Sequence, residues 1–197
     1  MTKEVLDPDK VVVIHNFLSG EECASLIRRS EDLVYEPGTV ADVVMEQVRN
    51  NERVVVDDVS LAVGLFNRAE PLLPAVFEGH GLVGFNERWR FYRYGPGQTF
   101  KPHRDGSYMR LKTWEESQMT FMIYLNDGMT GGETRFFKNM EQAFRQCPYL
   151  SVHPKAGMAL AFIHSIWHEG AVVHSGQKYV LRTDVMYKGS LEPIARD

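Results

Sequence analysis

The sequence predicts a mainly β fold with supporting α-helices, in which an antiparallel sandwich or barrel follows helices that can cover one of its sheets. Short runs rich in Val, Ile, Phe, Tyr and Thr recur between Gly, Pro, Asn and Asp from residue 84 onward, which is typical of many short antiparallel strands. Two helical patterns precede these runs. Because helices do not alternate with the later strands, a doubly wound α/β fold is disfavoured.

The first elements are a strand and a helix. The run VVVI at 11–14 predicts a short buried strand. The segment 16–33 predicts a helix, in which Ser19 is placed to cap the first turn and Glu22 is its capping-box partner three residues on. The apolar stripe of this helix comprises Cys23, Leu26 and Ile27.

A second helical pattern covers 57–79. Pro71 and Pro74 interrupt it, and a proline inside a helix removes a backbone hydrogen bond and clashes with the preceding turn. We therefore expect two helices in this region.

The later strands are expected in six runs, at 85–94, 119–126, 133–137, 149–154, 157–164 and 178–187. No linker is long enough to divide the chain. We therefore expect one domain over 1–197, in which a helical support (1–80) and a β core (84–188) share the same apolar interior.

Composition excludes several classes of protein. A hydrophobic content of 44% and a charged content of 24% are ordinary for a soluble globular chain, and a net charge of −4 provides no general attraction to nucleic acid. Cys23 and Cys147 have no metal-type spacing and fit a reducing compartment. The first residues resemble neither a signal peptide nor a membrane span, so we expect a cytoplasmic protein.

The segment KPHRDG at 101–106 contains the first candidate metal ligands. His103 and Asp105 are two residues apart, and in an extended chain such residues project to the same side. Two imidazoles and one carboxylate form the ligand set of non-haem Fe(II) oxygenases. A His-x-Asp pair alone is a weak signal, and a further histidine must come from downstream. The candidates are His153, His164, His168 and His174.

Among these, His168 has a basic residue, Lys178, ten positions later at the start of the last predicted strand. A metal ligand and a nearby ammonium group suit a chelating dicarboxylate, whose free end forms a charge-assisted hydrogen bond. His164 ends an apolar strand, where a structural role is plausible, and His174 lies in a polar turn.

Three motifs, YGPGQTFKPHRD, YLND…GGETRFF and HEGAVVHSGQKY, occur in order within residues 90–187. They resemble motifs of the 2-oxoglutarate- and Fe(II)-dependent dioxygenases of the prolyl 4-hydroxylase type, and VVVIHNFLSGEECASLI resembles, less specifically, the start of that domain. The resemblance implies a double-stranded β-helix (jelly roll) with N-terminal helices packed on one sheet. It also implies that His103, Asp105 and His168 are the iron ligands.

The same resemblance implies that Lys178 anchors the distal carboxylate of 2-oxoglutarate, while Tyr94 and Tyr124 line the cosubstrate pocket. Ascorbate is a further candidate cofactor. Arg182 lies four residues beyond Lys178 on the same strand face, and its planar fork also matches a carboxylate. The residues therefore leave Arg182 open as the anchor, as a substrate contact, or as the ion-pair partner of Asp184.

The implied activity is hydroxylation of a peptidyl residue, proline being the usual target of the family, or of a small molecule, with succinate and CO2 as coproducts. The alternatives are a nucleic-acid oxidative demethylase, which the acidic charge balance disfavours, a cupin-type metalloenzyme without 2-oxoglutarate, and a non-enzymatic jelly-roll binding protein. We expect neither a nucleic-acid nor a membrane partner. The sequence does not specify an oligomeric state.

Substrate selection is expected outside the barrel core, at the segments 48–58 and 106–118, which we place at the pocket mouth. Arg49 and Arg53 are in the first of these segments, and Arg90 shares a strand face with Tyr92 and Tyr94, so it points inward if Tyr94 does. An inward arginine needs an anion beside it. For these three residues the sequence leaves two partners open, a structural Asp or Glu and a substrate carboxylate.

Overall fold

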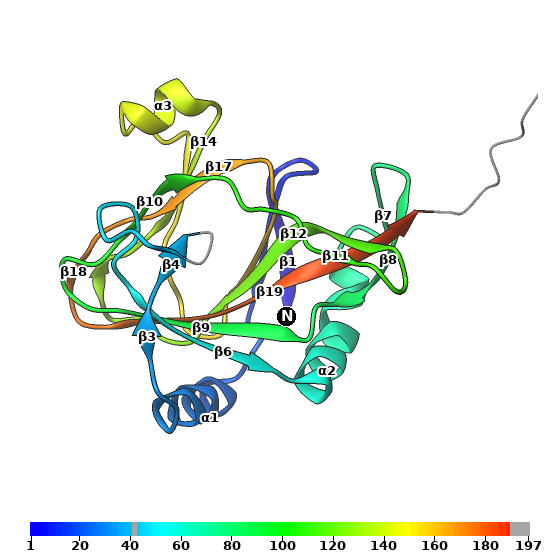
Figure 1. Cartoon of the computed structure of the whole chain (residues 1–197), viewed down its shortest axis with the longest axis horizontal. Helices are drawn as coiled ribbons and strands as arrows, with labels where there is room; N and C mark the ends of the chain where they lie inside the picture. Colours follow the sequence, from blue (N-terminus) through cyan, green and yellow to red (C-terminus); the bar gives the residue numbers. More distant parts are fainter. Residues whose placement is uncertain (41–42, 190–197) are drawn as a thin grey trace, which may run out of the picture.

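Two antiparallel sheets form the body of the molecule, and their facing sides share a buried apolar layer (Figure 1). The structure is a computed structural model that describes residues 1–40 and 43–189. The large sheet has the strand order β1 (Thr2–Asp7), β2 (Val11–His15), β16 (Ala159–Ile163), β12 (Glu115–Tyr124), β19 (Lys178–Gly189), β9 (Arg88–Tyr94), β6 (Glu52–Asp57) and β3 (Glu36–Pro37). The small sheet has the order β10 (Phe100–His103), β17 (Trp167–Gly170), β14 (Thr134–Phe137) and β15 (Leu150–Val152).

Shorter strands extend or flank these sheets. They are β8 (His80–Phe85), which pairs with the end of β19, β7 (Val76–Phe77), which pairs with β8, β11 (Met109–Arg110), which pairs with β12, and the pairs β13 (Thr130–Gly131) with β18 (Val173–Ser175) and β4 (Thr39–Val40) with β5 (Val43–Val44).

Strand β19 lies in the middle of the large sheet and pairs with β12 on one side and with β9 on the other. Successive side chains of a strand point to opposite faces. Val180 therefore packs in the layer between the two sheets, whereas Leu181 packs in the layer between the large sheet and the helices. Lys178 and Arg182 have the same parity as Val180, so β19 presents both cations to the small sheet.

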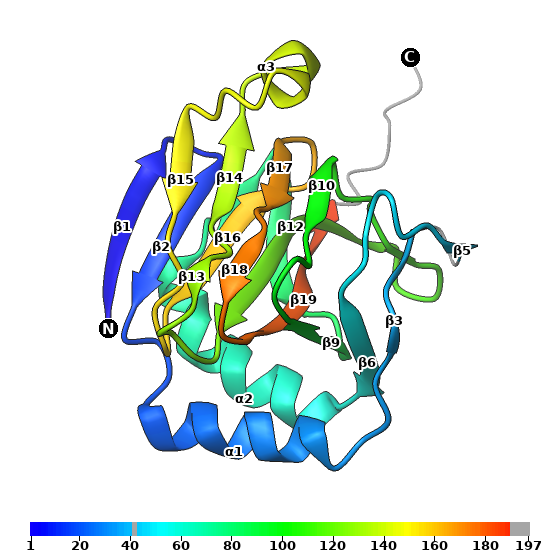
Figure 2. The same ribbon diagram turned by 90° about the vertical axis from the view of Figure 1, so that its left-hand side faces the viewer.

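Two helices cover the opposite face of the large sheet. Helix α1 (Gly20–Glu31) begins with the predicted capping box of Ser19 and Glu22, and α2 (Val59–Ala69) is capped by Asp58. Figure 2 shows α1 and α2 side by side below the strands. Their apolar side chains share one core with β12 and β19. The prediction of a mainly β fold with helices on one sheet is confirmed.

The N-terminal region is less helical than predicted. The unpredicted strands β1 and β6 join the predicted β2 in the large sheet, and β6 occupies 52–57 of the segment 48–58 that we expected to lie outside the core. Its run of three valines decides this, because Val54 is buried in the layer under the helices. The polar residues around these valines obscured the strand pattern.

Of the two helices predicted within 57–79, the described part of the chain contains the first, α2, but not a second α-helix. Its place is taken by one 3-10 turn, η1 (Glu70–Leu72), followed by β7. Pro71 is tolerated in the first turn, where its missing N–H has no partner to lose. A third helix, α3 (Met140–Phe144), was not predicted. It is short and is capped by Asn139.

Both cysteines are free thiols, with Cys23 buried and Cys147 exposed. No helix within residues 1–40 and 43–189 is both long and apolar enough to cross a bilayer.

Candidate metal centre and its pocket

The His-x-Asp pair and one downstream histidine meet on the small sheet. His103 ends β10 and His168 lies on β17, where the two residues are directly opposite each other. The pairing of β10 with β17 shifts register between Phe100 and His103, and the rings of these two residues stack with centroids 3.6 Å apart. Asp105 follows β10, and each of the three residues offers a ligand atom within 4.8 Å of the others.

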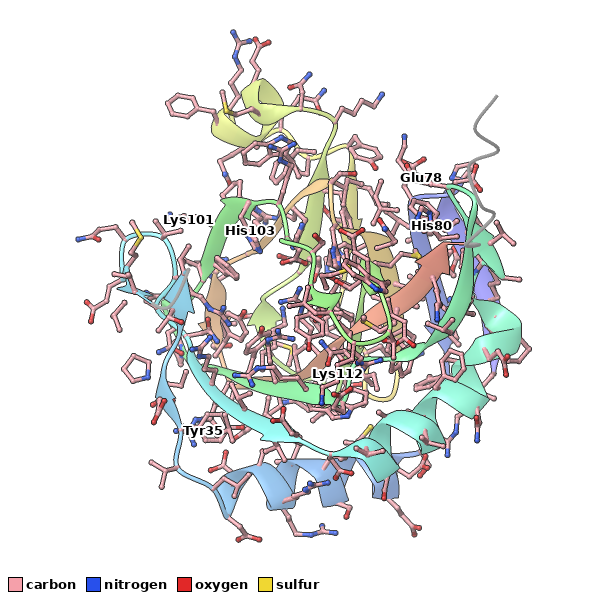
Figure 3. All side chains as sticks on the ribbon, turned by 45° about the vertical axis from the view of Figure 1, so that its right-hand side comes forward. Tyr35, Glu78, His80, Lys101, His103 and Lys112 are labelled. Carbon is pink, nitrogen blue, oxygen red and sulfur yellow. The ribbon has the colours of Figure 1, made fainter. Side chains whose placement is uncertain are left out.

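The backbone fixes which nitrogen each imidazole presents. Nδ1 of His103 lies 2.8 Å from the carbonyl oxygen of Lys101, and Nδ1 of His168 lies 3.0 Å from that of Ile166. A protonated Nδ1 donates to each carbonyl, which leaves the Nε2 lone pairs free. These Nε2 atoms lie 3.7 and 3.6 Å from the Asp105 carboxylate. Figure 3 shows His103 on β10, beside the packed interior and far from His80 at the other end of the molecule.

The protonation states suit a divalent cation. Burial, together with the neighbouring His168, lowers the pKa of His103 to about 3, and burial also lowers the pKa of His168. Burial opposes ionisation of Asp105, but Arg182 and the two imidazoles outweigh it and keep the pKa of the carboxyl well below its usual range. Two neutral imidazoles and one carboxylate on one side of a pocket are the donor set that Fe(II) takes in 2-His-1-carboxylate sites.

Asp105 is held from three sides. Thr120 donates its hydroxyl hydrogen to Oδ2, Nη2 of Arg182 lies 3.0 Å from the same oxygen, and the backbone N–H donates to the carbonyl of His164 at 3.1 Å. Such contacts orient a ligating carboxylate before any metal binds. The roles of Thr120 and of the His164 carbonyl were not predicted, because they depend on how β12 and β16 are placed beside the 103–105 loop.

The pocket in front of these ligands extends between the two sheets to Lys178. It is lined by Tyr92, Tyr94, Phe100, His103, Asp105, Thr120, Met122, Thr134, Phe162, His168, Gly170, Lys178, Val180 and Arg182. The ligands and a buried cation therefore share one cavity.

Lys178 is 2% exposed, and its Nζ donates to the carbonyl of Gly132 at 2.6 Å. The ammonium lies 5.2 Å from the ring centre of Tyr94 and 5.4 Å from that of Tyr124. No carboxylate of the described residues lies within 4.0 Å of it. Burial lowers the pKa of Lys178 to about 7, which Glu133 only partly offsets.

The two predicted pocket tyrosines differ in position. Tyr94 lines the cavity, and burial raises its pKa to about 12. Tyr124 is fully buried behind the lining and donates its hydroxyl hydrogen to Thr134 at 2.7 Å. Tyr124 therefore supports the wall next to Lys178, whereas Tyr94 is part of it.

Arg182 is engaged by acidic partners. Its guanidinium lies 3.0 Å from Asp105 and 3.3 Å from Asp184. Of the three alternatives open in the sequence, the structure contains the ion pair with Asp184. The pocket is lined by two cations, Arg182 and Lys178. Of these, Lys178 has no acidic partner among residues 1–40 and 43–189.

The other downstream histidines lie outside the ligand cluster. His153 and His174 are exposed. His164 is buried, with Nε2 3.8 Å from Asp184. Of the four downstream candidates, only His168 has a ligand atom beside His103 and Asp105 in the described part of the chain.

Comparison with known proteins gives a consistent result. Residues 89–183 match the model of the 2OG-Fe(II) oxygenase superfamily. Over 138 residues the chain is 30% identical to Prolyl 4-hydroxylase 1 of Arabidopsis thaliana. That match covers 64% of this chain and 46% of the plant protein, so it spans about half of that relative's length.

Solved structures resemble the chain over most of its length. A Pseudomonas putida prolyl-4-hydroxylase superposes with a TM-score of 0.67 at 19% identity, covering 89% of this chain and 92% of the other. A viral collagen prolyl hydroxylase from Paramecium Bursaria Chlorella virus-1, solved with 2OG, gives 0.58 at 19% identity, covering 93% and 99%. A Trichoplax adhaerens prolyl hydroxylase in complex with a peptide fragment gives 0.67 at 16% identity, covering 91% and 84%. These likenesses confirm the jelly-roll fold.

Proposed function

We propose that the chain, whose residues 89–183 match the model of the 2OG-Fe(II) oxygenase superfamily, is a member of that superfamily. In this proposal it is an Fe(II)- and 2-oxoglutarate-dependent dioxygenase that hydroxylates a C–H bond and releases succinate and CO2. One observation carries the proposal. A His–Asp–His cluster, in which His168 is buried and the other two residues are half-buried, and a buried lysine without an acidic partner among the described residues line the same cavity. Together they suit a dicarboxylate. A metal on the cluster chelates one end of it, and the ammonium forms an ion pair with the other end.

In this proposal His103, Asp105 and His168 hold the iron, which supplies the activation of dioxygen that is coupled to decarboxylation of the cosubstrate. The chain contributes binding and orientation. The backbone carbonyls behind His103 and His168 keep both Nε2 atoms aimed at one point. Thr120 and Arg182 leave part of the Asp105 carboxylate free to ligate.

Lys178 binds the distal carboxylate of 2-oxoglutarate, and its position between Tyr94 and Tyr124 excludes water from that ion pair. Arg182 is less suited to this role, since Asp105 and Asp184 already neutralise it. The cationic end of the pocket and the metal end then fix the cosubstrate at two points.

We propose a peptidyl residue, proline being the first candidate, or a small molecule as the substrate, because the named relatives are prolyl hydroxylases. The apolar layer shared by α1, α2 and the large sheet supports one dioxygenase domain over 1–197. The two free thiols support a cytoplasmic location. The net charge of −4 disfavours a nucleic-acid substrate.

The test measures succinate formed from 2-oxoglutarate with Fe(II), ascorbate and a panel of proline-containing peptides and free amino acids. We expect wild-type turnover to be abolished in His103→Ala, Asp105→Ala and His168→Ala, because each change removes one of three ligands. His174→Ala is the matched control, since that histidine is exposed. Undiminished turnover in His168→Ala would show that the ligand set is wrong.

A further inference from the structure

Four arginines lie on the pocket side of the large sheet or next to it, and the proposed catalytic roles use none of them directly. Arg182 and Arg90 are opposite each other on β19 and β9, and Arg53 on β6 is opposite Tyr92. These three share the face of the sheet that Tyr92 presents to the pocket. Together with Arg49, which precedes β6, we call them the arginine strip.

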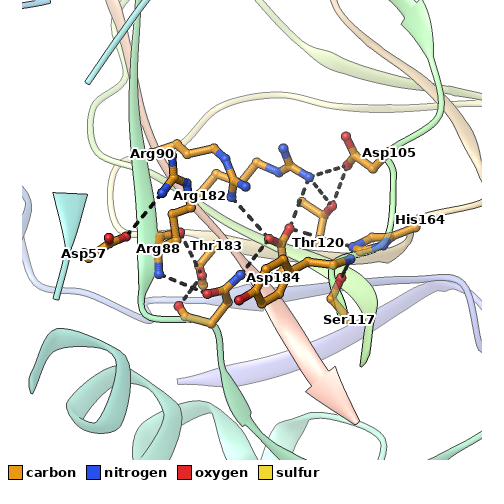
Figure 4. A network of polar contacts seen from close by, with 12 residues as sticks. Asp57, Arg88, Arg90, Asp105, Ser117, Thr120, His164, Arg182, Thr183 and Asp184 are labelled. Carbon is orange, nitrogen blue, oxygen red and sulfur yellow. Dashed lines mark hydrogen bonds and ion pairs between the residues drawn. The ribbon is translucent and has the colours of Figure 1, made fainter. Parts of the chain in front are cut away.

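The acidic residues near this strip are few. Figure 4 shows Arg90 and Arg182 both directed at Asp184, at 3.2 and 3.3 Å. Arg182 also contacts Asp105. No carboxylate in the described part of the chain lies within 4.0 Å of Arg49 or Arg53, although Glu36 is opposite Arg53 in the neighbouring strand.

Arg49 is a buried member of the strip whose guanidinium is incompletely hydrogen-bonded. It is 4% exposed, and its guanidinium lies between the rings of Tyr92 and Phe100, 4.4 Å from each centre. Nε donates to Asn51 at 2.7 Å and Nη1 reaches the carbonyl of Thr39 at 3.4 Å, but Nη2 is buried and lacks a hydrogen-bond partner among the described residues. A buried charge without a counterion is costly, and stacking on two rings offsets only part of that cost.

When metal and cosubstrate are bound, the strip has an excess of positive charge. Fe(II), the Asp105 carboxylate, the 2-oxoglutarate dianion and the Lys178 ammonium together carry no net charge. Asp105 is already counted as a proposed metal ligand. Among the described carboxylates, that leaves Asp184 alone at ion-pair distance from the four guanidiniums. The field of the strip is strong enough to act on Tyr92. Burial would raise the pKa of its phenol, but Arg182, Arg49 and Arg90 together lower it to about 8.

We propose that the arginine strip binds a carboxylate of the primary substrate, so that this enzyme selects a carboxylic acid over an uncharged stretch of peptide. The inference rests on the proposed function. Planar guanidinium forks and the Tyr92 hydroxyl match the geometry of a carboxylate. Arg182 lies 3.0 Å from the Asp105 carboxylate, so an anion held by the strip places its neighbouring carbon atoms beside the metal centre.

The cosubstrate itself is the other source of a carboxylate, but Lys178 provides a separate site for its distal end. Arg182 lies four positions beyond Lys178 along β19, which is about 13 Å in an extended strand. The metal ligand Asp105 is at the Arg182 end of this distance. The geometry therefore assigns Lys178 to the cosubstrate and the strip to the substrate.

The experiment uses the full chain with Mn(II), a redox-inert substitute for iron, and saturating 2-oxoglutarate. Calorimetry at pH 7 compares N-acetyl-L-proline with N-acetyl-L-prolinamide, which differ by one carboxylate, and N-acetyl-L-alanine with its amide. We expect each acid to bind about tenfold or more tightly than its amide. Arg49→Met keeps the stem of the side chain and removes the charge, and it should bring this ratio close to one while leaving 2-oxoglutarate affinity within about threefold.

Arg28→Met is the matched control, because Arg28 is exposed on α1 at the other face of the large sheet; it should retain the wild-type ratio. Arg53→Met provides a second, half-buried variant if Arg49→Met fails to fold, and it should lower the ratio about threefold. Circular dichroism and the melting temperature report folding.

Three results would overturn the inference. The first is equal affinity for acids and amides, or binding of neither. The second is a loss of 2-oxoglutarate affinity in Arg49→Met with the ratio unchanged, which would assign the strip to the cosubstrate. The third is a loss of Mn(II) affinity in that variant, together with an equal loss of affinity for the acid and for the amide. It would show that Arg49 only supports the stack of Phe100 on His103. Failure of the proposed function has a different signature, namely no succinate and no tight binding of Mn(II) and 2-oxoglutarate.

Discussion

At the scale of single residues, Lys178 is a cation that loses its proton close to neutral pH. Its ammonium is buried against two tyrosine rings and one carbonyl, and its pKa is lowered to about 7. Only the protonated form attracts a carboxylate, and the bound carboxylate in turn favours the protonated form. In the proposed role of Lys178 as the anchor, binding of 2-oxoglutarate above pH 7 therefore takes up a proton.

This gives a pH dependence with a defined sign. Below pH 7 the affinity for 2-oxoglutarate should be nearly constant, because Lys178 is already charged. Above pH 7 it should weaken by about tenfold for each pH unit until the pKa of the complex is reached. The measurement is a titration of the Mn(II)-loaded protein with 2-oxoglutarate from pH 6 to pH 9.

The Lys178→Met variant is the control for this profile. It should bind 2-oxoglutarate weakly at every pH and lose the slope, because no group then titrates against the distal carboxylate. A slope that persists in this variant would show that another group anchors the cosubstrate.

The ligands of the candidate site were predictable at this scale, whereas their surroundings were not. His103, Asp105 and His168 are in motifs that can be read along the chain, and Lys178 follows from its spacing. The contacts of Thr120 and Arg49 depend on the register between strands that are far apart in sequence. No local pattern shows that β12 brings Thr120 to Asp105, or that Arg49 lies between Tyr92 and Phe100.

At the scale of elements, the entry into α1 depends on a close approach of two backbones. Gly157 has a φ of +76°, and the N–H of Leu18 donates to its carbonyl at 3.0 Å. A Cβ at this position would lie 2.1 Å from the carbonyl oxygen of Leu18. The turn before β16 therefore fixes where the chain leaves β2 and begins the helix.

We expect Gly157→Ala to lower the free energy of unfolding by about 2–4 kcal/mol, because the backbone is left-handed there and the neighbouring backbone cannot yield. Urea denaturation measures the change. Gly64→Ala is the paired control, since Gly64 is inside α2 with nothing within 4 Å of an added Cβ. That substitution should instead stabilise the protein by about 0.5–1 kcal/mol. Equal effects of the two changes would contradict this explanation.

Element prediction succeeded where the local signal was strong. The capping box of α1 and the apolar run of β2 are each sufficient for the assignment. It failed where an element is short or where polar residues interrupt it. Examples are α3, with five residues, and β17, whose four residues include His168 and Glu169. Pairing with β10 and β14 makes β17 a strand, and that pairing cannot be seen locally.

At the scale of the whole molecule, the candidate metal centre joins the two sheets, with ligands from segments that are far apart in the sequence. His103 and His168 come from neighbouring strands of the small sheet, and Asp105 is tied to the large sheet through Thr120 and Arg182. A cation bound by all three residues connects the two sheets and stabilises the folded state only.

Addition of Mn(II) at about a hundred times its dissociation constant should therefore raise the free energy of unfolding by about 2.7 kcal/mol. For a chain of this size that corresponds to an increase of roughly 5–10 °C in the melting temperature. Calorimetric scans with and without EDTA measure the effect, and His168→Ala should remove it. If that variant is stabilised as strongly as the wild type, the ion binds elsewhere.

The register shift in β10 has a further consequence. Three steps of β10 from Phe100 to His103 face two steps of β17 from Gly170 to His168, so one strand accommodates an extra residue between two fixed pairs. That extra residue lets an aromatic ring and an imidazole three positions apart stack on the same side, which an evenly pleated strand does not permit. Chain length between these positions therefore matters more than the identity of Lys101 or Pro102, and relatives that keep the ring and the imidazole should show neither insertions nor deletions between them.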